Sequence, residues 1–399
     1  MTTLTADPAP TRQRPRFISD VAIALAVYAL TRVWGVVLIN RAAAEQQPSI
    51  WTGPTPGYFD MAQLWDAQWY KIIATDGYPL PLPIDAAGAV QQNPWAFFPG
   101  FPYTVKAVMA LTSLPFSPAA VLTNVVLGGC LVVVVLRLLQ RVAGQGAGLG
   151  AVVLLCALPS APVLQIAYSE TLALLLLALA MTWLLDRRYL LTAVAVLLLS
   201  LTRPVAAPFA VMVAVHLVVR WRSRRTDPLT RRGAGSVVAL GLFSAVASVI
   251  WPVTVQLFTG VPSAYTRIQG AWRTGGVVQR PYEQTLDITR LLWGAHGPRW
   301  LALGAVAFAA LVLSPAGRRL GAELRTWVLA YPAYLLAVIE PWTSTYRYAL
   351  LMFPVLVLPG AVRKVGPLIV VVLALVGLAY QARWVDELLI FVPPADYPP

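Results

Sequence analysis

Apolar runs of about twenty residues recur along the whole chain, and this feature limits the possible folds most strongly. Each run is long enough to cross roughly 30 Å of hydrocarbon as a helix. None of the long runs alternates between apolar and polar residues, as membrane-barrel strands do over about ten residues. Charged residues are only 12% of the 399 residues, about half of the roughly 25% found in soluble domains. The sequence therefore predicts an all-α polytopic membrane protein.

We expect about eleven transmembrane helices. They lie near residues 17–40, 117–140, 148–166, 168–185, 189–204, 205–222, 234–258, 298–313, 323–340, 347–361 and 366–384. The apolar segment 97–114 contains Pro99, Pro102 and Lys106, so it either crosses the membrane or stays at its surface as an interfacial or re-entrant helix.

The basic loops favour the second interpretation of 97–114. If this segment does not cross, five basic loops share the inner face, as the positive-inside rule requires. These loops contain Arg137/Arg141, Arg187/Arg188, Arg220–Arg232, Arg318/Arg319/Arg325 and Arg363/Lys364. The net charge of +13 is then explained by membrane orientation, and we expect no nucleic acid partner.

This map gives one transmembrane domain, 17–385, between a cytoplasmic tail, 1–16, and an external tail, 386–399. Two long loops, 41–96 and 259–297, lie on the external face together with the polar motifs of the later loops. Because functional residues concentrate on loops, we expect the site on this extracytoplasmic face. The heavy use of Ala, Val, Leu and Arg suggests a bacterial source, which would place the protein in the plasma membrane.

The cysteine and histidine content indicates neither a disulfide framework nor a metal centre. Cys130 and Cys156 both fall inside apolar spans. No histidine or acidic cluster has the spacing of metal ligands. We therefore expect no metal and no other essential cofactor.

The first external loop contains a segment with helical spacing. Its apolar residues recur every three to four positions from Met61 to Ile73, and Gly77 follows as a residue that ends a helix. This pattern predicts one short amphipathic helix along the membrane interface, with tryptophans at headgroup depth.

Two aspartates of this segment are candidates for chemistry. Asp60 precedes Gln63 by three positions, which is typical of a helix N-cap with its capping-box partner. Asp66 is expected in the middle of the helix, between Trp65 and Trp69, where it caps nothing. It either belongs to a solvated polar face or serves as a general base among aromatic side chains. Asp60 is the second choice for that role.

Several motifs together resemble one family. They are Trp65-Asp66-Ala67-x-x-Tyr70-x-x-Ile73-Ala74-x-x-Gly77-Tyr78, Ala96-Phe97-Phe98-Pro99-Gly100-Phe101-Pro102, Ala167-Tyr168-Ser169-Glu170 and, more weakly, Arg203 and Arg347-Tyr348. This combination is similar to the PIG-V family, the second mannosyltransferase of GPI-anchor assembly and its bacterial relatives. The resemblance implies a GT-C membrane fold, a polyprenyl- or dolichyl-phosphate mannose donor and inversion at the anomeric carbon. It also implies an acidic base in the first external loop, where Asp66 lies.

A lipid-phosphate leaving group needs cations around it as charge develops, and arginine suits phosphate best. Candidate groups for the donor phosphate or the substrate are Arg203, Arg347, Tyr348, Arg273, Arg267, Glu170, Tyr168, Lys71, Trp65, Trp69 and Tyr70. Structural interpretations remain open for several of them. Arg203 can extend to the headgroups, Lys71 can contact them, and Glu170 can serve the dipole of the helix that it begins.

The function indicated is a glycosyltransferase that takes a sugar, mannose by the resemblance, from polyprenyl phosphate and not from a nucleotide. Its acceptor would be a glycolipid, a lipoglycan or a protein. The alternatives are a transporter or lipid flippase of a cell-envelope glycan pathway, and a non-catalytic assembly partner. An enzyme requires that Asp66 share a cavity with Arg203 or Arg347.

Overall fold

The computed structural model describes residues 13–49, 51–273, 275–362 and 364–391, and within these ranges the fold is helical. No β-strand occurs among the described residues, where Ile84 and Val90 form an isolated bridge. The longer helices are α1 (Gln13–Glu45), α4 (Gly100–Thr112), α5 (Phe116–Ala143), α6 (Gln145–Ala157), α7 (Glu170–Leu185), α8 (Tyr189–Ser200), α9 (Ala206–Arg222), α10 (Arg231–Ala247), α14 (Gly297–Leu313), α15 (Gly321–Val338) and α18 (Gly366–Leu389). The prediction of an all-α fold is confirmed.

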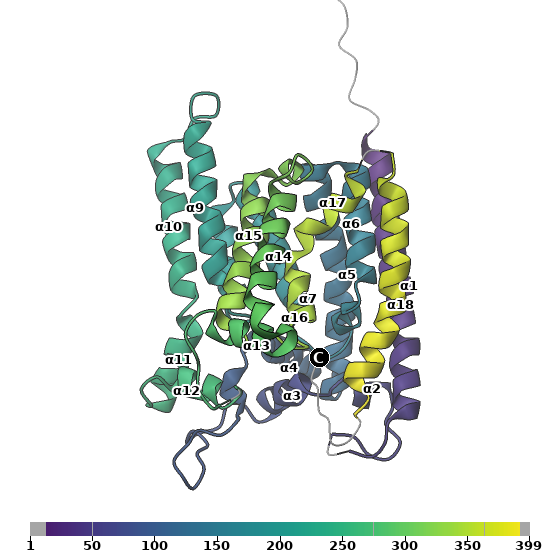
Figure 1. Cartoon of the computed structure of the whole chain (residues 1–399), viewed down its shortest axis with the longest axis vertical. Helices are drawn as coiled ribbons and strands as arrows, with labels where there is room; N and C mark the ends of the chain where they lie inside the picture. The colour runs from purple at the N-terminus through teal and green to yellow at the C-terminus, as the bar shows by residue number, and fades with distance from the viewer. Residues whose placement is uncertain (1–12, 50, 274, 363, 392–399) are drawn as a thin grey trace, which may run out of the picture.

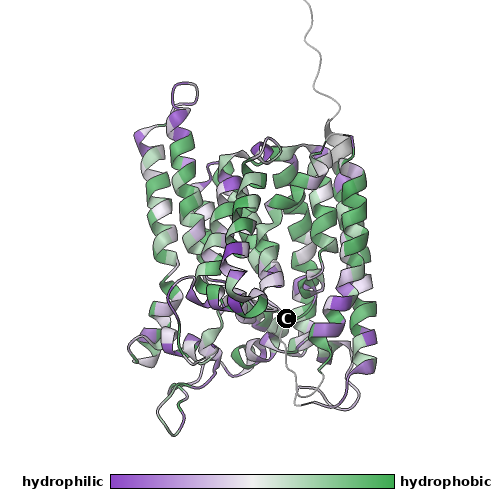
Figure 2. Cartoon of the chain, viewed as in Figure 1, coloured by the Kyte–Doolittle hydropathy of each residue, from purple (hydrophilic) through white to green (hydrophobic). Residues whose placement is uncertain are grey.

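Shorter helices fill the connections between these helices. They are α2 (Tyr58–Met61), α3 (Asp66–Thr75), η1 (Pro94–Ala96), η2 (Ala161–Leu164), α11 (Ile250–Thr259), α12 (Ala264–Gly270), α13 (Glu283–Trp293), η3 (Gly294–His296), η4 (Gly317–Leu320), α16 (Thr345–Tyr348), η5 (Ala349–Leu356) and α17 (Val357–Gly360). Most of the longer helices stand side by side as a bundle, and α2, α3, α4, α11 and α12 lie at its lower end in Figure 1. The helix bodies are apolar, and polar residues gather toward the two ends (Figure 2).

Four described helical segments are long and apolar enough to cross a membrane singly. They are Ile18–Glu45, Phe116–Ala143, Glu283–Leu313 and Gly366–Leu389, and the pair α10 and α11, bent by 44°, counts as a fifth. Several other predicted spans are shorter; α7, for example, has 16 residues, about 24 Å at 1.5 Å per residue. The pattern is that of a polytopic membrane protein, and the count of eleven spans stays a prediction.

Prolines explain where the helices depart from the predicted spans. The span 148–166 ends early because Pro159 follows Leu158, and a residue before proline is pushed out of the helical conformation. The span 234–258 breaks after Ala247 because the ring of Pro252 would clash with the carbonyl of Ser248. The segment 347–361 contains short helices, η5 among them with Pro354 inside it.

The ends of the chain also differ from the predicted boundaries. Residues 1–12 of the N-terminal tail and 392–399 of the C-terminal tail lie outside the described residues, as does Arg363 of the last basic loop. Within the described part, α1 already begins at Gln13 and α18 continues to Leu389.

The helix directions support the interpretation of 97–114 as a segment that does not cross. Gln140 near the end of α5 donates to Asp20 near the start of α1 at 2.7 Å, so these two helices are antiparallel. The chain from 46 to 115 therefore begins and ends at one end of the bundle, where α4 lies (Figure 1). Ion pairs link three of the basic loops at the opposite end, joining Arg141 to Asp186 and both Arg187 and Arg220 to Asp227.

Candidate active site

A pocket of about 580 Å³ opens at the end of the bundle that carries the long loops. Its lining comes from α3, the segment 96–98, the segment 202–205, α12 and the residues after it, the end of α15, and α16. Asp66, Arg203 and Arg347 all line this pocket. The condition set by the sequence for an enzyme is therefore met.

The segment 58–75 forms two helices, so the prediction of one continuous helix is wrong. α2 ends at Met61 and α3 begins at Asp66. Ala62 and Leu64 in the break turn their carbonyl groups to other partners. The amide of Ala167 donates to Ala62 at 2.9 Å, and the Tyr168 hydroxyl donates to Leu64 at 3.4 Å. The residues just before the Trp-Asp-Ala motif are thus bonded to Ala167 and Tyr168, the first two residues of the Ala-Tyr-Ser-Glu motif.

Trp65 holds the break in place. Its φ of 58° lies in the left-handed region, which is costly for a bulky residue. The side chain is only 7% exposed, and its indole N–H donates to the carbonyl of Leu388 at 3.0 Å. This strained residue sets the direction in which α3 starts.

Asp66 is consequently the first residue of α3, and its predicted position in the middle of a helix is wrong. Trp69 and Tyr70 follow three and four positions later, so all three side chains share one helical face and line the pocket. Burial raises the pKa of the Tyr70 hydroxyl, and nearby Asp66 adds to this shift. The protonated hydroxyl of Tyr70 donates to Ser169 at 3.0 Å.

Asp60 has a structural contact, although not as the N-cap that the sequence predicts. It is the third residue of α2, and its Oδ2 accepts a hydrogen bond from the amide of Gly57 at 2.9 Å. Asp60 does not line the pocket. Gly77, with a φ of 87°, follows the end of α3 as predicted.

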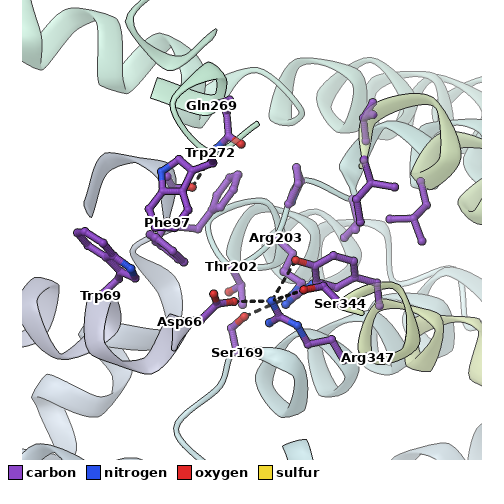
Figure 3. A pocket seen from close by; sticks show the side chains of 18 of the residues that line it. Asp66, Trp69, Phe97, Ser169, Thr202, Arg203, Gln269, Trp272, Ser344 and Arg347 are labelled. Carbon is purple, nitrogen blue, oxygen red and sulfur yellow. Dashed lines mark hydrogen bonds and ion pairs between the residues drawn. The ribbon is translucent and has the colours of Figure 1, made fainter. Parts of the chain in front are cut away.

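An ion-pair network joins four charged side chains from distant parts of the sequence. Arg347 donates to Asp66 Oδ2 at 2.5 Å and to Glu170 Oε1 at 2.9 Å, and Arg203 donates to the same Oε1 at 2.5 Å. Arg347 is 2% exposed and Glu170 is fully buried. Buried charges are tolerated when paired in this way. The network fixes two guanidinium groups beside one carboxylate, Asp66, that reaches the pocket (Figure 3).

Some donors and acceptors of this network are left for a ligand. Asp66 Oδ1 has no hydrogen-bond partner among the described residues, and neither has Arg203 Nη1. The Arg203 guanidinium also lies over the ring of Tyr348, at 4.5 Å from its centroid. The pocket therefore offers a free carboxylate oxygen and a free guanidinium nitrogen.

A glycine permits the close approach of two further motifs. The amide of Gly100 donates to the carbonyl of Leu201 at 2.7 Å. A Cβ at Gly100 would lie 2.4 Å from Thr202 Oγ1 and 2.8 Å from the Leu201 carbonyl oxygen, so no other residue fits without displacing this backbone. The Phe-Phe-Pro-Gly motif thereby packs directly before Arg203.

Aromatic rings line the opposite side of the pocket. Trp69 stacks on Phe97 with centroids 5.9 Å apart, and Trp272 meets both rings edge-on at 5.2 and 5.3 Å. Gln269 lies beside them. In the view of Figure 3, Asp66 lies between these aromatic rings and the two arginines.

The other candidates divide between the pocket wall and its surroundings. Trp65, Tyr348 and Arg273 line the pocket, whereas Tyr168 and Glu170 lie behind the wall and Lys71 and Arg267 lie away from it. Arg273 donates to Gln284 at 2.6 Å and to the Val338 carbonyl at 2.5 Å. Burial lowers the pKa of Arg273, although Glu340 opposes this shift.

Sequence reasoning missed several pocket residues, among them Gln92, Ser169, Thr202, Gln269, Trp272, Tyr334 and Ser344. Ser169 belongs to a motif that the sequence singled out, and Trp272 precedes Arg273, so proximity to candidates was a usable signal for these two. Tyr334 lies in an apolar helix, and the sequence did not indicate which side of that helix lines the pocket.

Among the described residues, no group of three or more histidine, cysteine or acidic side chains is arranged to hold a metal ion. The prediction that no metal is needed therefore stays a prediction.

Comparisons with known proteins found partial likenesses of fold. No family profile and no curated sequence matches the chain. The structure of ArnT from Cupriavidus metallidurans bound to undecaprenyl phosphate is similar at a TM-score of 0.47 and 16% identity, over 84% of this chain and 59% of that one. The Archaeoglobus fulgidus oligosaccharyltransferase, solved with zinc and sulfate, is similar at 0.42 and 13%, over 94% and 54%. The chain thus spans little more than half the length of either protein.

Proposed function

We propose that this protein is an inverting glycosyltransferase of the GT-C type that uses a polyprenyl-phosphate sugar. The observation that carries the proposal is the pocket shared by Asp66, Arg203 and Arg347, with Asp66 between the arginines and an aromatic wall. It supports a base beside two phosphate-binding groups, and it favours an enzyme over the transporter or flippase alternative.

The donor phosphate is assigned to the basic side of the pocket. Arg203 can donate a hydrogen bond to the phosphate from Nη1. Arg347 can share its guanidinium between Asp66 and a phosphate oxygen. Arginine forms bidentate hydrogen bonds with phosphate, and these bonds are stronger in a site that is partly shielded from water. The acceptor is assigned to the aromatic side of Trp69, Phe97 and Trp272, where flat rings can stack on it.

Transfer then needs one proton acceptor. Asp66 Oδ1 takes the proton from the acceptor hydroxyl as that oxygen attacks the anomeric carbon from the face opposite the phosphate. The bond between this carbon and the phosphate oxygen breaks, its electron pair stays on the phosphate, and the anomeric configuration inverts. The leaving lipid phosphate departs without protonation while Arg203 and Arg347 stabilise its growing charge.

The sugar is proposed to be mannose on the strength of the PIG-V resemblance, which is carried by motifs that surround the pocket. The test compares purified protein given polyprenyl-phosphate mannose with protein given GDP-mannose and no lipid carrier. We expect transfer from the lipid donor alone. Transfer directly from GDP-mannose would refute the proposed donor. Mass spectrometry of glycolipids from a deletion strain would identify the acceptor.

The pocket is proposed to open on the extracytoplasmic side of the plasma membrane. The basic loops at the other end of the bundle, which include Arg224 and Arg319, motivate this orientation. Reporter fusions at these two positions should give a cytoplasmic signal. An external signal from either position would invert the map and place the pocket in the cytoplasm.

A further inference from the structure

Glu170 is the member of the charged network that cannot touch a substrate. It begins α7, is fully buried and does not line the pocket. Its Oε1 accepts from both guanidinium groups, at 2.5 Å from Arg203 and 2.9 Å from Arg347, whereas its Oε2 is buried and has no hydrogen-bond partner among the described residues. Glu170 can therefore affect a ligand only without touching it, by its charge and through the two arginines that it holds.

The charge of the network bears on release of the product. Two arginines and two carboxylates sum to zero formal charge. A phosphodiester donor carries one negative charge, but the lipid phosphate left after transfer is a monoester, whose second ionisation near pH 6 brings it close to two negative charges at neutral pH. Two unopposed arginines would hold this product more tightly than the donor, and the site would stay occupied.

We propose that Glu170 is a positioning residue that limits how tightly Arg203 and Arg347 hold a lipid phosphate, so that the monoester product leaves. This inference rests on the proposed function. The carboxylate keeps both guanidinium groups in place, and its negative charge offsets part of the positive charge with which they attract the ligand. This offset weakens binding of the doubly charged product more than binding of the singly charged donor.

The test uses Glu170→Gln, which keeps an oxygen acceptor in place and removes only the charge. Binding of farnesyl phosphate, a monoester, and of methyl farnesyl phosphate, a diester, is titrated by calorimetry in detergent. We expect the variant to bind the monoester about tenfold more tightly and the diester only about threefold more tightly, because the Coulomb energy scales with ligand charge. In turnover, the donor KM and kcat should both fall because product release slows.

The matched control is Glu323→Gln. Glu323 is another buried glutamate of the bundle, paired with His216 at 3.0 Å, and it does not line the pocket. This variant should leave the ratio of monoester to diester affinity unchanged.

A second pair of variants covers the case in which Glu170→Gln does not fold. In an Arg203→Gln background, adding Glu170→Gln leaves Arg347 paired with Asp66, so no buried cation is stranded. The affinity ratio should rise from the single variant to the double one. If the unaltered protein binds neither farnesyl ligand, the proposed function fails. If it binds both and loss of the Glu170 charge leaves the ratio unchanged, only this inference is overturned.

Discussion

Two arginine ion pairs, one at each end of the bundle, differ sharply in exposure. At the pocket end, Arg347 is 2% exposed and pairs with two carboxylates. At the other end, Arg141 pairs with Asp186, but its side chain is 50% exposed. Exposed pairs contribute little to stability, whereas buried ones cost desolvation energy that good geometry only partly offsets. The comparison teaches that Arg347 is buried and paired at a cost that points to function, whereas an exposed pair such as Arg141–Asp186 carries no such cost.

The largest contrast should come from removing one arginine at each end. Arg347→Gln leaves Asp66 and Glu170 with less compensation, and breaking a buried pair in this way typically costs about 3–5 kcal/mol. We expect a clear drop in melting temperature and transfer reduced by about 10³-fold or more. Arg141→Gln should change neither by a comparable amount. Thermal melts and initial rates in detergent measure both, and equal effects at the two ends would remove the distinction drawn here.

A smaller contrast is expected between tryptophans of the two ends. Trp69 stacks on Phe97 in the pocket, whereas Trp221 is 55% exposed at the opposite end. Trp69→Leu should lower kcat/KM for the acceptor by about five- to tenfold, the value of one aromatic contact, with the donor KM unchanged. Trp221→Leu serves as the control and should be silent. A change confined to the donor KM would show that the aromatic wall does not bind the acceptor.

The smallest effect is expected within the pocket end itself. Asp60→Asn should alter transfer by no more than about twofold, because asparagine also accepts hydrogen bonds at helix starts. Rates with saturating donor provide the measurement. A dead Asp60→Asn variant beside an active Asp66→Asn variant would mean that the wrong aspartate is assigned as the base.

The sequence was sufficient to predict the helical class, and it singled out four charged residues that line the pocket: Asp66, Arg203, Arg273 and Arg347. Hydrophobic length, basic loops and local motifs are all readable along one chain. The position of Asp66 at the start of a helix could not be predicted in this way. The break before it depends on carbonyl groups that accept hydrogen bonds from Ala167 and Tyr168, about a hundred residues away. Likewise, nothing local indicates that Arg203 and Arg347 share one oxygen of Glu170. Side-chain pairings between distant segments are fixed by packing, and the sequence supplies the participants without their partners.

The most direct test of the account is turnover of Asp66→Asn with saturating lipid donor. Asparagine keeps the shape of the side chain and an oxygen for Arg347, but it cannot take the proton of the acceptor hydroxyl. We expect transfer to fall by about 10² to 10⁴ while the protein still folds and binds farnesyl phosphate at least as tightly as the unaltered protein, because a negative charge beside Arg347 is removed. Near-normal transfer by this variant would contradict the assignment of Asp66 as the base and, if Asp60→Asn is also active, the proposal that the pocket is catalytic.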